Sequence, residues 1–140
     1  MSFDEIRENF ELLDDWEDRY RYLIELGRAL PPLEPALKTE GTKVRGCASQ
    51  VWLISRQDTS KNDEKTLHFQ GESDAHIVQG LIAVLLAIHS GQTAKEILAT
   101  DTLARFGELG LQEHLTPQRS NGLASMVARI KSDATTAAEA

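Results

Sequence analysis

The residue with the clearest capacity for chemistry is Cys47, the only cysteine in the 140-residue chain. It follows Gly46, and a glycine at this point keeps the approach to the sulfur open. If residues 43–47 are extended, Lys43, Arg45 and Cys47 point to the same side, because strand side chains repeat every second residue. Two cations beside a thiol favour the nucleophilic thiolate. The pattern predicts a reactive thiol, with a buried apolar cysteine as the equal alternative.

A single cysteine also limits what the chain can hold. It excludes an intramolecular disulfide, a pair of redox cysteines and a metal site with two or more thiolates. An iron–sulfur cluster usually takes about four protein ligands, most of them cysteines, so a cluster scaffold is not expected. The histidines lack the i, i+4 spacing of a zinc site, so we expect no metal. We place all four at the surface or at helix ends: His68, His76, His89 and His114.

Length and composition predict one domain, since about 150 residues per domain is usual. The chain has 22 acidic and 15 basic residues and a net charge of −7, which disfavours nucleic acid and anionic membrane surfaces as partners. The longest strongly apolar run, Leu81–Ile88, is far shorter than the roughly 20 residues that span a bilayer. Because the first residues show no signal-peptide pattern, we expect a cytoplasmic protein.

Apolar spacing and N-cap signals predict six helices around a small sheet. The helix that runs to about His89 is apolar on nearly every side, which is typical of a buried central helix. Gly27 is expected near the end of the second helix, and residues 134–140 are expected to fray. The expected helix starts are Ser2, Asp14, Ser73 or Asp74, Thr93, Asp101 and Thr116.

Strand signals gather in the middle of the chain, after a proline-rich segment that predicts a loop. The run 49–56 is apolar on both faces, as in a strand that is covered on both sides. The polar stretch 57–65 predicts a hairpin loop, and residues 66–70 a second strand. Residues 43–45 are expected to add a short third strand. The predicted fold class is α+β, with a small antiparallel sheet packed against helices.

Several motifs resemble the SufE-like family of sulfur acceptors, in an order and spacing that cover roughly residues 10–131. Around the cysteine these are Gly46-Cys47-Ala48-Ser49-Gln50-Val51-Trp52, then Gly71-Glu72-Ser73-Asp74-Ala75, then Ile77-Val78-Gln79-Gly80-Leu81. The others are Trp16-Glu17-Asp18-Arg19-Tyr20, Leu30-Pro31-Pro32-Leu33, and His114-Leu115-Thr116 with Arg119 and Asn121-Gly122-Leu123. The glycine–cysteine motif alone is weak, but the ordered set is specific. Glu72 stands where the family often has aspartate.

The resemblance implies a single SufE-like domain whose fold is related to the IscU-type cluster scaffolds. It implies that Cys47 takes sulfane sulfur from a cysteine desulfurase of the SufS or CsdA kind and carries it as a persulfide. The chain would stimulate the desulfurase and pass the sulfur to an iron–sulfur assembly scaffold complex. Pyridoxal phosphate is then expected on the desulfurase, and no cofactor on this chain. The sequence leaves open the choice between SufE and its paralogue CsdE, and the formation of a homodimer.

Three charged residues are secondary candidates for binding the desulfurase or orienting the cysteine loop: Arg119, Asp74 and Arg45. A plain helix N-cap is the simpler role for Asp74. Because a persulfide is open to attack by oxidants and small thiols, we expect the loop around Cys47 to tuck the sulfur inward when free and to swing outward on the partner.

Two other functions remain open from the sequence. A thiol hydrolase would use Cys47 with a histidine base within ~3 Å of the sulfur. A non-catalytic adaptor would bind the desulfurase through its surface, while the thiol stays structural.

Overall fold

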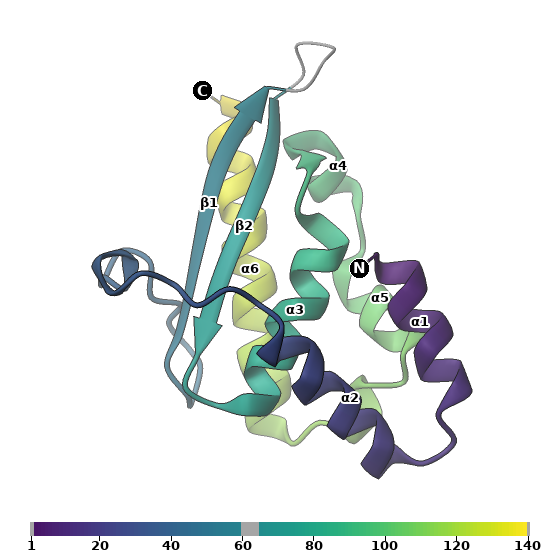
Figure 1. Ribbon diagram of the computed structural model, residues 1–140. Coiled ribbons are helices and arrows are strands. Elements are labelled where there is room, and N and C mark those ends of the chain that lie inside the picture. Colours follow the sequence, from purple (N-terminus) through teal and green to yellow (C-terminus); the bar gives the residue numbers. More distant parts are fainter. Residues whose placement is uncertain (1, 60–64, 140) are drawn as a thin grey trace.

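A long antiparallel hairpin lies against a layer of helices, and the last helix runs along its length (Figure 1). The computed structural model describes residues 2–59 and 65–139. The described strands are β1 (Val51–Thr59), β2 (Lys65–Ser73) and β3 (Gln92–Thr93). The described helices are α1 (Phe3–Leu12), α2 (Trp16–Arg28), α3 (His76–His89), α4 (Ala94–Ala99), α5 (Thr102–Glu108) and α6 (Pro117–Glu139), with short 3-10 turns at Pro35–Leu37 and Gln112–His114. This is the predicted α+β class.

The sheet has the order β1-β2-β3 and is antiparallel throughout, as predicted. The predicted position of the third strand is wrong: Lys43 makes only an isolated bridge to Trp52, and the third strand is β3. The two long strands also extend into the predicted hairpin loop, to Thr59 on one side and from Lys65 on the other. The rest of that loop, residues 60–64, lies outside the described residues.

The first strand is covered on both faces, although unequally. Val51 and Leu53 are fully buried on one face, whereas Trp52 and Ile54 on the other are only partly buried. The segment after α2 crosses the opposite face of the hairpin (Figure 1). There the ammonium of Lys38 lies 5.2 Å from the centre of the Trp52 ring and pairs with the carboxylate of Glu72. This ion pair lowers the pKa of Glu72, whose other oxygen accepts a hydrogen bond from the Leu33 amide.

The central helix α3 is buried nearly all round, as predicted, and Leu81, Ile82, Val84 and Leu85 are fully enclosed. It packs against α2 on one side and β2 on the other. Among the described residues, no helix is long and apolar enough to cross a membrane.

The contact between α2 and α3 depends on two glycines. A Cβ atom on Gly27 would lie 2.7 Å from the Gly80 nitrogen, and one on Gly80 would collide with the Leu23 carbonyl oxygen. Gly27 lies near the end of its helix, as predicted, but the helix contact gives it a different role from ending the helix. Gly27 is buried within α2, and its missing side chain lets the two backbones touch.

The helix ends correct two further predictions. Asp15, not Asp14, caps α2 by accepting a hydrogen bond from the Glu17 amide. At the other end of the chain, α6 continues to Glu139 rather than fraying from residue 134. Ala134 is fully buried, so packing against the core holds a stretch whose own residues are small and polar.

His89 ends α3, in line with the prediction of a surface or helix-end position, and it is fully buried there. Its Nδ1 lies 2.9 Å from Gln92 Oε1, and its Nε2 lies 2.8 Å from the Thr102 hydroxyl. With Nδ1–H as donor and the hydroxyl donating to Nε2, both contacts suit a neutral ring. Burial lowers the pKa of His89, and the nearby Lys131 charge acts in the same direction.

We predict that Gly27→Ala lowers the free energy of unfolding by about 1–3 kcal/mol, because the added methyl forces the two helices apart. Gly107→Ala is the matched control. A Cβ at position 107 would lie 3.7 Å from Gln112 Oε1, an ordinary contact. Because alanine favours a helix more than glycine does, Gly107→Ala should raise the free energy of unfolding by about 0.5–1 kcal/mol. Urea unfolding measures both variants, and equal stability of the two would contradict the close helix contact.

We also predict that His89 weakens the fold in mild acid. The folded state has the lower pKa, so below pH ~6.5 the unfolded chain binds more protons and stability falls as the pH falls. Full stability is reached above that pH. Urea unfolding measured from about pH 7.5 down to pH 5 should show that the free energy of unfolding falls more steeply with pH in the parent than in His89→Gln. The same pH dependence in both proteins would rule the effect out.

Candidate functional site

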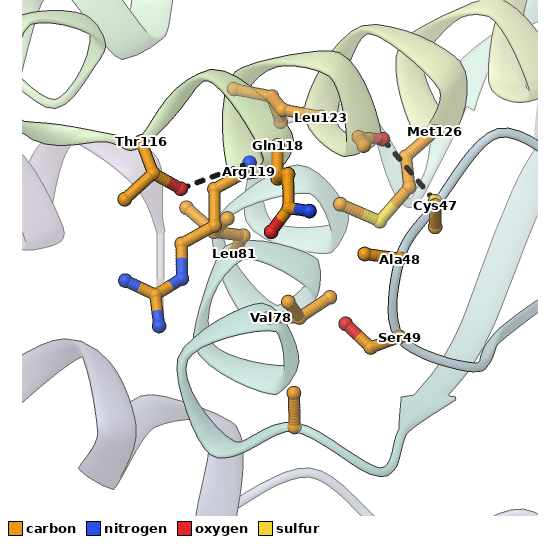
Figure 2. A pocket seen from close by; sticks show the side chains of 12 residues that line it. Cys47, Ala48, Ser49, Val78, Leu81, Thr116, Gln118, Arg119, Leu123 and Met126 are labelled. Carbon is orange, nitrogen blue, oxygen red and sulfur yellow. Dashed lines mark hydrogen bonds between the residues drawn. The ribbon is translucent and has the colours of Figure 1, made fainter.

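Cys47 lies in the short loop between the Lys43 bridge and strand β1 (Figure 2). Its side chain is half-buried, and the thiol donates a long hydrogen bond to the Gly122 carbonyl of α6, with Sγ and oxygen 3.6 Å apart. The loop packs directly against this turn of α6, since a Cβ on Gly122 would lie in ordinary van der Waals contact with the sulfur, at 3.6 Å. The inward thiol agrees with the prediction that the loop tucks the sulfur inward in the free chain. The outward movement on the partner stays a prediction.

The thiol opens into a pocket of about 290 Å³ between the loop, α3 and α6 (Figure 2). Its apolar wall consists of Val78 and Leu81 from the central helix and of Leu123 and Met126 from α6. Polar groups from the loop and the start of α6 complete the lining: Ser49, Thr116, Gln118 and Arg119. The arrangement places one sulfur nucleophile beside a space that is apolar on its inner side.

The predicted pair of cations beside the thiol is wrong. The chain turns at Arg45 and Gly46, where glycine has a φ of 90°, and the strand-like alternation is lost. The Arg45 guanidinium is 82% exposed and lies 3.7 Å from the Glu40 carboxylate. Burial raises the pKa of the Cys47 thiol, so the resting group is the protonated thiol rather than the thiolate.

Arg119 lines the same pocket, so the structure brings this predicted residue to the cysteine site. Its amide donates to the Thr116 hydroxyl, 3.3 Å away, in the cap of α6. Its guanidinium points away from Cys47 (Figure 2) and has no hydrogen bond or ion pair with the residues that the structure describes. A long, exposed cation at the edge of the pocket can contact an acidic group on another molecule.

Asp74 does not cap α3, because the N-cap position is Ala75. The Asp74 carboxylate instead accepts a hydrogen bond from the Gln50 amide, 3.0 Å away, and its own amide donates to the Gln50 carbonyl at 3.3 Å. These two bonds fasten the end of the cysteine loop to the connection between β2 and α3. Asp74 thus reaches the site through the loop backbone and not through the pocket.

No histidine lines the pocket among the described residues, which argues against a hydrolase with a histidine base beside Cys47. Sequence reasoning missed Gly122 and Met126, which lie against or near the sulfur. Gly122 belonged to a quoted motif, and Met126 to the predicted apolar stripe of the last helix. Nothing in the linear sequence pairs either residue with Cys47.

Comparison with known proteins gives this site a family. The chain matches the SufE family, described as an Fe-S metabolism associated domain, over residues 4–134. The chain belongs to the SufE family. An uncharacterised SufE-like protein of Rhizobium meliloti is 55% identical over 133 residues, covering 95% of this chain and 94% of the relative. A second one, from Rhizobium etli, is 54% identical over 134 residues, covering 95% of this chain and 89% of the relative.

A solved structure shares the fold. The solution structure of a hypothetical protein from Thermus thermophilus superposes with a TM-score of 0.74 and 21% sequence identity, and the match covers 100% of both chains. SufE membership supports a general role in sulfur transfer for iron–sulfur metabolism, in a family that works with cysteine desulfurases.

We predict that iodoacetamide alkylates Cys47 with a pH midpoint above that of the same cysteine in the urea-unfolded chain, because burial disfavours the thiolate. Arg45→Gln should leave the midpoint of the folded protein unchanged, since the Arg45 charge is exposed and pairs elsewhere. A midpoint below that of the unfolded chain, or an upward shift in the variant, would show that cations do act on the thiol.

Proposed function

We propose that this chain accepts sulfane sulfur from a cysteine desulfurase onto Cys47 and carries it as a persulfide. One observation supports this above the others: the only thiol of the chain is half-buried at the mouth of a partly apolar pocket. A hydrolase needs a base beside the sulfur, and no described residue of that kind lines the pocket. A carrier needs only a nucleophile that a partner can reach and an environment that protects the product.

The transfer step is a thiol–persulfide exchange. The Cys47 thiolate attacks the terminal sulfur of the donor's cysteine persulfide. A new S–S bond forms on Cys47 Sγ while the S–S bond of the donor breaks, and the donor cysteine leaves as a thiolate. The proton lost from the Cys47 thiol passes to the solvent or to that thiolate. No net oxidation or reduction occurs, so the step needs no further reactant.

The resting geometry favours protection over reactivity. A protonated thiol hydrogen-bonded to Gly122 is a poor nucleophile, so the free chain reacts slowly with oxidants and small thiols. On the desulfurase the loop swings outward, leaves the apolar wall and gains water or a partner cation, which lowers the cost of forming the thiolate. Reactivity is therefore switched on by the correct donor.

The remaining roles follow from the same proposal. The exposed guanidiniums of Arg119 and Arg45 contact acidic groups of the desulfurase, and Asp74 holds the end of the loop through Gln50. Pyridoxal phosphate belongs to the desulfurase, and this chain carries no cofactor of its own. Binding stimulates the desulfurase, and the loaded chain passes its sulfur to the iron–sulfur assembly complex.

We predict that incubation with a SufS-like desulfurase and cysteine adds about one sulfur atom (~32 Da) to the intact chain, and that a reductant removes it. Cys47→Ser should gain no mass, because serine cannot form a persulfide. Intact-protein mass spectrometry measures both. Ser49→Ala is the matched control, since it changes a neighbouring hydroxyl of the pocket and keeps the thiol.

One result would overturn the carrier assignment: if the parent gains no mass but still stimulates the desulfurase, the chain is an adaptor with a structural thiol. If Cys47→Ser stimulates the desulfurase as strongly as the parent does, activation does not need the thiol, and only the link between sulfur acceptance and stimulation is wrong.

A further inference from the structure

We propose that Arg129 is a positioning residue for Cys47: it clamps the base of the cysteine loop to α6, so that the thiol moves about a fixed point. The proposal rests on the sulfur-carrier function above. Arg129 does not line the pocket. It lies on α6, seven residues after Gly122, whose carbonyl accepts the hydrogen bond from the Cys47 thiol. Seven residues are two turns of helix, or roughly 10 Å.

The cysteine loop runs along one face of α6. Gly122, Ser125 and Arg129 are spaced three and four residues apart, so they share that face. Gly122 meets Cys47, and Ser125 lies against Gly46, where an added Cβ would be 2.5 Å from the serine oxygen. A side chain at that position is excluded twice, by this contact and by the positive φ of the glycine.

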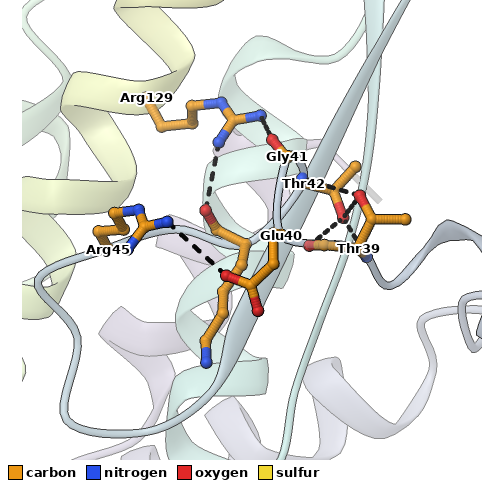
Figure 3. Close-up of polar contacts among 7 residues, drawn as sticks. Thr39, Glu40, Gly41, Thr42, Arg45 and Arg129 are labelled. Carbon is orange, nitrogen blue, oxygen red and sulfur yellow. Dashed lines mark hydrogen bonds and ion pairs between the residues drawn. The ribbon is translucent and has the colours of Figure 1, made fainter.

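Arg129 holds the start of the same loop (Figure 3). Its Nη2 donates to the Gly41 carbonyl at 2.7 Å and its Nη1 to the Lys43 carbonyl at 3.4 Å. Its Nε donates to the Asp133 carboxylate, 3.3 Å away on the next turn of the helix. The guanidinium is planar and forked, so an acceptor on each donor fixes its orientation. Arg45, by contrast, reaches only the exposed Glu40 (Figure 3).

Two further contacts limit the part of the loop that can move. The Val44 amide donates to the Val51 carbonyl at 2.8 Å, which ties the two ends of the loop together, and Asp74 binds Gln50 at the far end. Between these bonds lie residues 45–49, with Cys47 at their centre. A loop with two fixed ends samples fewer outward positions than one with a loose end, so each encounter with a donor finds the sulfur in a narrower range of orientations.

Loss of the clamp should therefore move two rates in opposite directions. A loosened base lets the thiol leave the pocket more often, so a small reagent reacts faster. The same loosening spreads the outward positions of the thiol, so transfer from the protein donor becomes slower. A side chain that merely stabilises the fold would not give this opposition, because a lower stability alone does not slow transfer well below the unfolding temperature.

The test compares Arg129→Gln with the parent and with Arg7→Gln. Arg7 is a matched control: its side chain is 35% exposed against 28% for Arg129, and it forms ion pairs with Asp4 and Glu108, away from the loop. Arg129→Lys keeps the charge but not the fork, and should restore the parent rates only in part. Asp133→Asn keeps the shape and weakens the support of the guanidinium, so it tests the clamp even if Arg129→Gln fails to fold.

We expect iodoacetamide to alkylate Cys47 about three to ten times faster in Arg129→Gln, the factor that matches the net contribution of about one ordinary hydrogen bond. We expect kcat/KM for sulfur transfer from the desulfurase to fall by a similar factor, with Asp133→Asn between parent and variant. Unchanged rates, or both rates changed alike in Arg129→Gln and Arg7→Gln, would overturn the clamp.

The two proposals fail in different ways. If the parent accepts no sulfur, the carrier function is wrong, and the alkylation rates still decide whether Arg129 holds the loop. If the parent accepts sulfur and Arg129→Gln matches it in both rates, only the clamp is wrong.

Discussion

A helix that is apolar on every side is stable only where every side is covered, and α3 imposes this condition on the rest of the chain. The hairpin covers one side, and α2 covers another at a distance that only the glycine pair permits. The remaining side of α3 faces α6, and there the buried side chains of Val78 and Leu81 form the inner wall of the pocket that the cysteine loop borders. The site thus lies where the central helix, α6 and the loop meet.

The position of Cys47 beside this apolar wall explains the low reactivity of its thiol. Cys47 is half-buried against apolar side chains, and this desolvation raises the pKa of the thiol. The same side chains line the inner side of the pocket beside the sulfur. Shielding and low reactivity are therefore one physical effect, and a protein that uses this cysteine as a nucleophile has to move it.

The sequence predicted the parts of the molecule that depend on local patterns. The apolar circumference of α3, the two-faced run of β1 and the caps at Ser2 and Thr93 each lie within a few residues, and each appears where expected. Cys47 was found as a lone thiol after a glycine, and the ordered motifs pointed to the right family. The motifs of the SufE pattern lie on α2 and the segment after it, on the cysteine loop, on the central helix and at the start of α6.

What failed depended on contacts between distant residues. Extended alternation placed Arg45 beside Cys47, but the turn at Gly46 lies against Ser125, which is far away in the sequence. The helix contact of Gly27 was missed because its partner Gly80 could not be known. The burial of His89 was missed because Gln92 and Thr102 close around it only in the fold. In each case a tertiary contact overrode a sound local rule. The position of the lone thiol can be read from the sequence, but the burial that sets its pKa cannot, because it depends on residues far away in the chain.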